Sequence, residues 1–107
     1  MKKIDLKTIG EREFNVLELC QTLIKLVKVW SWGAHAYRNY EDKVLRFRVR
    51  GNHHKGHVYI SLAWNDTFTV TLTSLQGNIK KTIYNVYIDV LVDTIDKEVE
   101  YIKEYAY

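Results

Sequence analysis

Hydrophobic residues recur along the chain first with the period of a helix and then with the period of a strand. Between Glu13 and Val27 the apolar positions return every three or four residues, which is typical of one face of an amphipathic helix. That face collects Val16, Leu17, Cys20, Leu23, Ile24 and Val27. We therefore predict a helix over 13–27, with Cys20 as a small buried side chain rather than a reactive thiol.

From Val29 onward apolar and polar residues alternate, as they do in strands that bury one face. The alternation covers 29–37, 44–50, 58–64 and 67–73, and a shorter run follows at 79–83. Polar or glycine-containing joints separate these runs, and their lengths suit hairpins between antiparallel neighbours. Three tryptophans share the parity of the buried face, which favours core packing over stacking on a ligand: Trp30, Trp32 and Trp64.

The last predicted element is a helix from Val86 to Lys103. Its apolar residues lie on one side, and its acidic residues lie on the opposite side, where we expect solvent. Asn85 is the expected N-cap, and Asp89 is placed near the positive end of the helix dipole. The order helix, strands, helix predicts an α+β fold. We expect an antiparallel meander sheet of three to five strands, with the N-terminal and C-terminal helices packed on one face.

Composition narrows the class of protein. With 107 residues, 47% of them hydrophobic, the chain is expected to form a single domain over residues 1–107. One cysteine excludes an internal disulfide, no apolar run approaches the roughly 20 residues of a membrane helix, and the basic N-terminus lacks the apolar core of a signal peptide. These features predict a cytoplasmic protein that does not act at a membrane.

The net charge is only +3, but residues 25–81 carry ten basic and three acidic side chains. If both helices cover one face of the sheet, the other face stays open and is rich in arginine. Guanidinium groups pair with phosphate, and phenol rings offer bases a stacking surface, so this face predicts a non-catalytic RNA- or DNA-binding module. A protein interface or homodimer contact on the same face is the alternative. The candidate contacts are Arg46, Arg48, Arg50, Lys55, Tyr59 and, if the first strand keeps its register, Tyr37 and His35.

Three histidines, His53, His54 and His57, fall in one hairpin, where imidazoles are able to bind zinc or nickel. No cysteine or carboxylate accompanies them in the sequence, so a polar hairpin is the preferred interpretation, and we expect no cofactor. Catalytic motifs such as a nucleophile elbow or a zinc-protease signature are also missing, so we do not expect an enzyme. His35 is the one imidazole placed for acid or base chemistry.

The element order resembles the double-stranded-RNA-binding domain and its relatives. Among these relatives, HicA-type toxins carry a Gly-Ser-His turn whose histidine serves RNA cleavage. Gly33-Ala34-His35 resembles that turn, and Tyr37, Arg38 and the strand 44–50 follow it. The resemblance covers about the first half of the chain and implies a third function, a ribonuclease that uses His35. Ala34 stands in the place of the serine, and at least two more strands precede the last helix.

Overall fold

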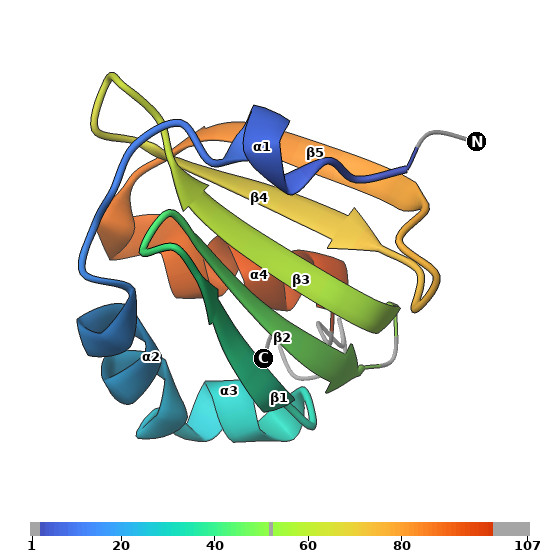
Figure 1. Ribbon diagram of the computed structural model, residues 1–107. Helices are drawn as coiled ribbons and strands as arrows, with labels where there is room; N and C mark the ends of the chain where they lie inside the picture. Colours follow the sequence, from blue (N-terminus) through green and yellow to red (C-terminus); the bar gives the residue numbers. More distant parts are fainter. Residues whose placement is uncertain (1–2, 52, 100–107) are drawn as a thin grey trace.

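Five antiparallel strands form one meander sheet, with helices before and after it (Figure 1). The computed structural model describes residues 3–51 and 53–99. The strands run in the order β1 (His35–Tyr40), β2 (Val44–Arg50), β3 (Lys55–Leu62), β4 (Phe68–Thr73) and β5 (Ile79–Val86). The helices are α1 (Leu6–Ile9), α2 (Val16–Ile24), α3 (Val27–Ser31), the short 3-10 helix η1 (Ile88–Val90) and α4 (Leu91–Val99). The predicted α+β class and the antiparallel meander are confirmed.

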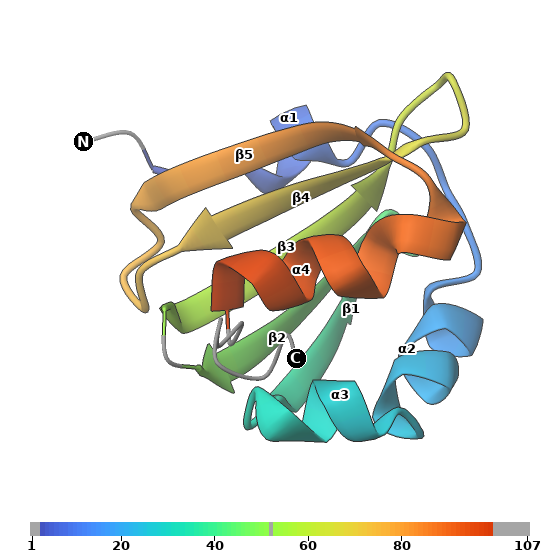
Figure 2. The same ribbon diagram turned by 180° about the vertical axis from the view of Figure 1, so that it is seen from behind.

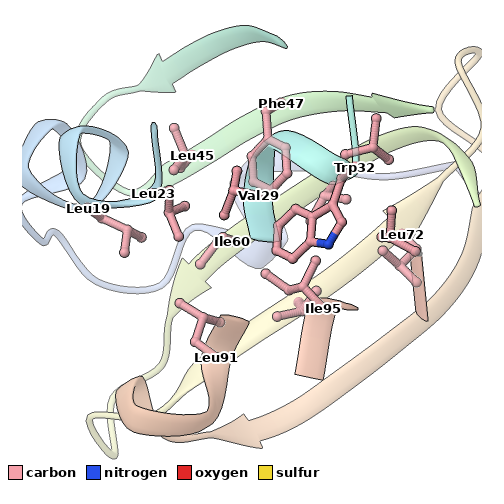
Figure 3. Close-up of a cluster of buried hydrophobic side chains, with 14 of the residues drawn as sticks. Leu19, Leu23, Val29, Trp32, Leu45, Phe47, Ile60, Leu72, Leu91 and Ile95 are labelled. Atoms are coloured by element: carbon pink, nitrogen blue, oxygen red, sulfur yellow. The ribbon is translucent and has the colours of Figure 1, made fainter. Parts of the chain in front are cut away.

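Helices α2, α3 and α4 pack on one face of the sheet, which we call the helix face. Figure 2 shows α4 crossing this face, with α2 and α3 lying beside β1 and β2. Alternate residues of β2, β3 and β4 meet them in a single core, as Figure 3 shows. Trp32 is fully buried there and stacks on Phe47, with ring centroids 6.3 Å apart. Its indole Nε1 donates a hydrogen bond of 2.8 Å to Asp96 Oδ1, which ties the end of α3 to α4.

The helix predicted over 13–27 is wrong in its extent and partly in its buried face. The chain turns at residues 25–26, so α2 ends at Ile24 and a separate α3 follows. Val16 and Leu23 are buried as expected, but Leu17 and Val27 are 62% and 77% exposed. Because α3 occupies residues that alternate in hydrophobicity, the predicted first strand begins six residues too early. Trp30 on α3 and Trp64 in the β3–β4 turn are exposed, so core packing was wrong for both.

The C-terminal helix begins later than the sequence predicts. Strand β5 continues to Val86, and Asn85 lies within it at a φ of 58°, so Asn85 is not an N-cap. Leu91, Ile95 and Val99 form the buried side of α4. Acidic residues near this helix are not simply solvated, since Asp93 pairs with Lys28 and Glu98 pairs with Lys81 at 2.9 Å and 2.8 Å. The predicted continuation to Lys103 lies outside the described residues.

The N-terminal segment crosses the opposite face of the sheet, which we call the outer face. Figures 1 and 2 place α1 and α4 on opposite sides of the sheet. Ile4 N–H donates to the Gly77 carbonyl at one end of the segment, and Phe14 N–H donates to the Asp42 carbonyl at the other, both at 2.8 Å. The sequence did not predict this covering.

The covering changes the character of the outer face. Several outer-facing residues that the sequence places in solvent are buried, namely Ser61, Thr69, Thr71 and Thr73. The prediction of a wholly open second face is therefore wrong, and only part of this face remains available. No helix within residues 3–51 and 53–99 is both long enough and apolar enough to cross a membrane.

Candidate functional site

The register of the first two hairpins brings basic side chains together on the outer face of β1, β2 and β3. Residues directly opposite each other on antiparallel strands share a face, and their Cβ atoms lie about 5 Å apart. We call the resulting three cross-strand groups the basic rows. They are Arg38 opposite Arg46; Arg48 between His35 and His57; and Arg50 opposite Lys55.

The basic rows lack compensating acids. Within the described part of the chain, none of Arg38, Arg46, Arg48 and Arg50 forms an ion pair, because the ion pairs found there are Arg12–Asp66, Lys28–Asp93 and Lys81–Glu98. Like charges directly opposite one another on adjacent strands are destabilising, by up to about 1 kcal/mol for a pair. An anion bound across the rows would remove this repulsion.

Arg46 is held in place by an aromatic ring. Its guanidinium carbon lies 5.6 Å from the ring centroid of Tyr40, which is the distance of a cation–π contact. Its Nε is buried without a hydrogen-bond partner among the described residues. The stem of this arginine is thus fixed against the sheet, and no carboxylate among the described residues pairs with its charge.

His57 sits in the middle row next to Arg48. The pKa of His57 lies below its ordinary value because of partial burial first, and then because of the nearby charges of Arg46 and Arg48 and the imidazole of His54. Its Nδ1 is buried without a partner in the part of the chain that the structure describes. A proton on Nδ1 would be a buried donor without an acceptor, so we assign the proton of the neutral ring to Nε2.

The two tyrosines expected to stack on bases are not placed to do so. The predicted position of Tyr37 on the outer face is wrong, because an irregularity between His35 and Arg38, with Ala36 at a φ of 55°, turns Tyr37 to the helix face. There its ring lies 5.3 Å from Phe47, and burial raises its pKa to about 12. Tyr59 does lie on the outer face, but it is only 6% exposed. The same irregularity brings Arg38 to the outer face opposite Arg46, whereas the alternating pattern had placed it on the buried side.

The hairpin histidines do not converge. His54 is buried, and its Nε2 lies 3.2 Å from the carbonyl oxygen of His57, whereas His53 is exposed on the loop. Residues 3–51 and 53–99 contain no group of three side chains positioned to hold a metal ion. His35 joins the basic rows as predicted, with Nδ1 2.7 Å from the Gly33 carbonyl oxygen.

A groove on the same side of the sheet lies apart from the basic rows. It has a volume of about 530 Å³ between the N-terminal segment and strands β4 and β5, and its floor includes Thr69, Thr71 and Thr82. No residue of the basic rows lines it. The rows instead occupy the pleated surface of the sheet, which suits contact with an extended partner more than enclosure of a small molecule.

Comparison of the chain with family models, curated protein sequences and solved structures finds no match. The topology also departs from the resemblance noted in the sequence, because five strands rather than three stand between the helices. The chemistry of the basic rows is therefore the basis for assigning a function.

Proposed function

We propose that the basic rows bind the phosphate backbone of RNA or DNA, and that the protein is a non-catalytic nucleic-acid-binding module. The observation that carries this proposal is the pairing of like charges across strands, such as Arg38 opposite Arg46, with no carboxylate partner among the described residues. The fold accepts this repulsion in the free protein. A polyanion is the partner that relieves it.

The spacing of the arginines fits several phosphates at once. Arg46, Arg48 and Arg50 alternate along β2, so their side chains leave the strand at intervals of about 6.8 Å. Arg38 and Lys55 widen this line onto the two neighbouring strands. Each guanidinium offers a planar fork of donors to a phosphate group, so a single extended strand would meet several forks in succession.

The contacts are expected to position a backbone rather than read bases. Tyr59 is buried and Tyr37 faces the helices, so neither supplies the exposed ring on which a base would stack. Phosphate contacts carry no direct sequence information. Binding should therefore depend strongly on salt and weakly on nucleotide sequence.

The test is fluorescence anisotropy of labelled single-stranded RNA, duplex RNA and duplex DNA at a series of salt concentrations. The test variant replaces Arg46, Arg48 and Arg50 by glutamine. A matched control variant replaces Lys25, Lys28 and Lys97 by glutamine, which removes the same charge from the helix side. We expect the arginine variant to lower the slope of log affinity against log salt by about two to three.

The control variant should bind nearly as well as the wild-type protein. Equal losses in the two variants would mean that only net charge matters, and wild-type affinity retained by the arginine variant would rule out the basic rows as the site. RNA recovered from the same samples should be intact. Cleavage that is absent with His35→Ala would instead favour the ribonuclease alternative.

A protein interface is the second candidate, and the observation that favours it lies on the helix side. Ile24, Val27 and Trp30 leave 44%, 77% and 66% of their surfaces exposed around the junction of α2 and α3. The Trp30 indole donates a hydrogen bond to the Ile24 carbonyl, which holds the ring over this junction. Sedimentation of the wild-type protein and of Trp30→Ala over a range of concentrations tests this candidate. A monomer at all concentrations excludes a homodimer.

A further inference from the structure

His57 is a titratable imidazole in the middle of the basic rows, and its Nδ1 is buried without a partner among the described residues. It faces Arg48 on β2 and Thr73 on β4, which are its direct cross-strand neighbours. The ring of Tyr59 meets the imidazole edge-on, with centroids 6.1 Å apart. Its exposed fraction is intermediate, so the ring remains accessible at the surface of the sheet.

A proton added to His57 meets only positive or neutral groups. Arg46 and Arg48 approach from β2, and Lys55 and Tyr59 lie on the same face of its own strand β3. Thr73 faces it from β4, and His54 bonds to its backbone carbonyl from the preceding loop. No carboxylate among the described residues offsets these charges, so the imidazolium form is unfavourable in the free protein.

We propose that phosphate binding by the basic rows is coupled to uptake of a proton by His57, so that affinity for nucleic acid rises as the pH falls. This inference rests on the proposed function. Because the neutral ring carries its proton on Nε2, the added proton goes to Nδ1. A phosphate held by Arg46 and Arg48 neutralises the two charges that oppose this protonation, and its hydrogen bond from Nε2–H becomes charge-assisted when the ring is protonated. Protonated His57 then adds one more cation to the rows.

Linkage gives the direction and the size of the effect. Burial and the two arginines hold the pKa of His57 below its ordinary value in the free protein, and a bound phosphate raises it. At a pH between the pKa of His57 in the free protein and its pKa in the complex, binding takes up one proton. The affinity then rises by up to about tenfold for each pH unit of acidification. Above both values, His57 is neutral in both states and the effect vanishes.

The experiment measures the affinity of labelled oligouridylate by anisotropy from about pH 5.5 to about pH 8, at constant ionic strength. The variants are His57→Gln and, as a matched control from the same hairpin, His53→Gln. The wild-type protein and the control should bind more tightly as the pH falls. His57→Gln should lose the part of this gain that belongs to His57. The pKa of the His57 imidazole, followed by NMR, should rise when oligouridylate saturates the protein.

The outcomes separate the two proposals. If the wild-type protein shows no salt-sensitive binding at any pH, both the proposed function and the coupling are overturned. If it binds, but His57→Gln keeps the full pH dependence or the pKa of His57 does not rise on binding, the coupling alone is overturned. Because the NMR signal reports His57 directly, a change in affinity caused by misfolding of the variant would not be mistaken for support.

Discussion

His54 shows how a single residue of the hairpin differs from its neighbours. It is 5% exposed, and as a neutral ring it donates from Nε2 to the His57 carbonyl. Burial is the main reason that its pKa lies below the ordinary value of 6.5, and the positive charge of Lys80 acts in the same direction. His54, a candidate metal ligand in the sequence, is thus a buried structural residue whose imidazole is neutral in the folded protein.

The free energy of unfolding should therefore fall as the pH drops below about 6.5. The unfolded chain binds a proton at His54 more readily than the folded chain does, so acidification favours unfolding down to the lowered pKa of the folded state. One such group changes stability by at most about 1.4 kcal/mol per pH unit. Urea unfolding at about pH 5 and pH 7.5 measures this slope, and His54→Gln should reduce it. A slope that is identical in the variant would contradict the role given to His54.

The alternating pattern predicts which side of a strand a residue faces, and this prediction succeeds for some residues and fails for others. Alternation predicts the side of a strand correctly for Phe47, because the strand around it is regular. It fails for Tyr37, because one left-handed residue at Ala36 reverses every later side chain in that strand. The left-handed conformation cannot be predicted from an alanine side chain. Arg38 was missed as a residue of the outer face for the same reason.

Pairs of strands, rather than single residues, create the candidate site. The three arginines of β2 are plain in the sequence, but their partners depend on the register of two hairpins. Arg38 and Lys55 become neighbours of Arg46 and Arg50 only after the β1–β2 and β2–β3 turns have closed. The sequence could therefore predict an arginine-rich strand, whereas the like-charged rows required the pairing.

Removing one charge from such a pair should stabilise the free protein. We expect Arg38→Gln to raise the free energy of unfolding by a few tenths of a kcal/mol at low salt, since it ends the repulsion with Arg46. The gain should shrink as salt rises, because salt screens the charges of the wild-type pair. Thermal unfolding at two salt concentrations tests this. The same variant should bind nucleic acid more weakly, and a loss of stability at low salt would argue against repulsion between the rows.

The helices were predicted less well than the strands, because the sequence does not mark where they begin and end. Strands β2 and β4 match their alternating runs closely, because alternation continues to the turn on each side. The break between α2 and α3 could not be predicted, because residues 25 and 26 include neither glycine nor proline. The short α1 has too few residues to display a period at all.

At the scale of the whole molecule, the sheet has two differently covered faces. Three helices seal the helix face, while the N-terminal segment covers only part of the outer face and leaves the basic rows of β1 to β3 uncovered (Figure 1). The prediction that both long helices share one face is confirmed by the common core of α2 and α4. The N-terminal covering was not predicted, because it depends on contacts between residues far apart in the sequence, such as Ile4 and Gly77.

A polyanion that binds the folded protein should raise its thermal stability. Binding to the native state alone stabilises it by about 2.7 kcal/mol when free ligand reaches a hundred times its dissociation constant. We expect the melting temperature to rise with the concentration of oligouridylate, and the rise should be lost when Arg46, Arg48 and Arg50 are replaced by glutamine. Differential scanning fluorimetry on both proteins measures the shift. An equal shift in the two proteins would place the binding elsewhere.

The N-terminal segment also bears on the order in which the chain folds during synthesis. Each strand of the meander pairs with the next one to leave the ribosome, so the sheet is able to grow as the chain emerges. Ile4 of this segment is synthesised before the sheet, yet its partner Gly77 is made more than seventy residues later. We expect the residues around Ile4 to remain unpaired until the β4–β5 hairpin has been made, and the threonine surface beneath them to stay hydrated until then.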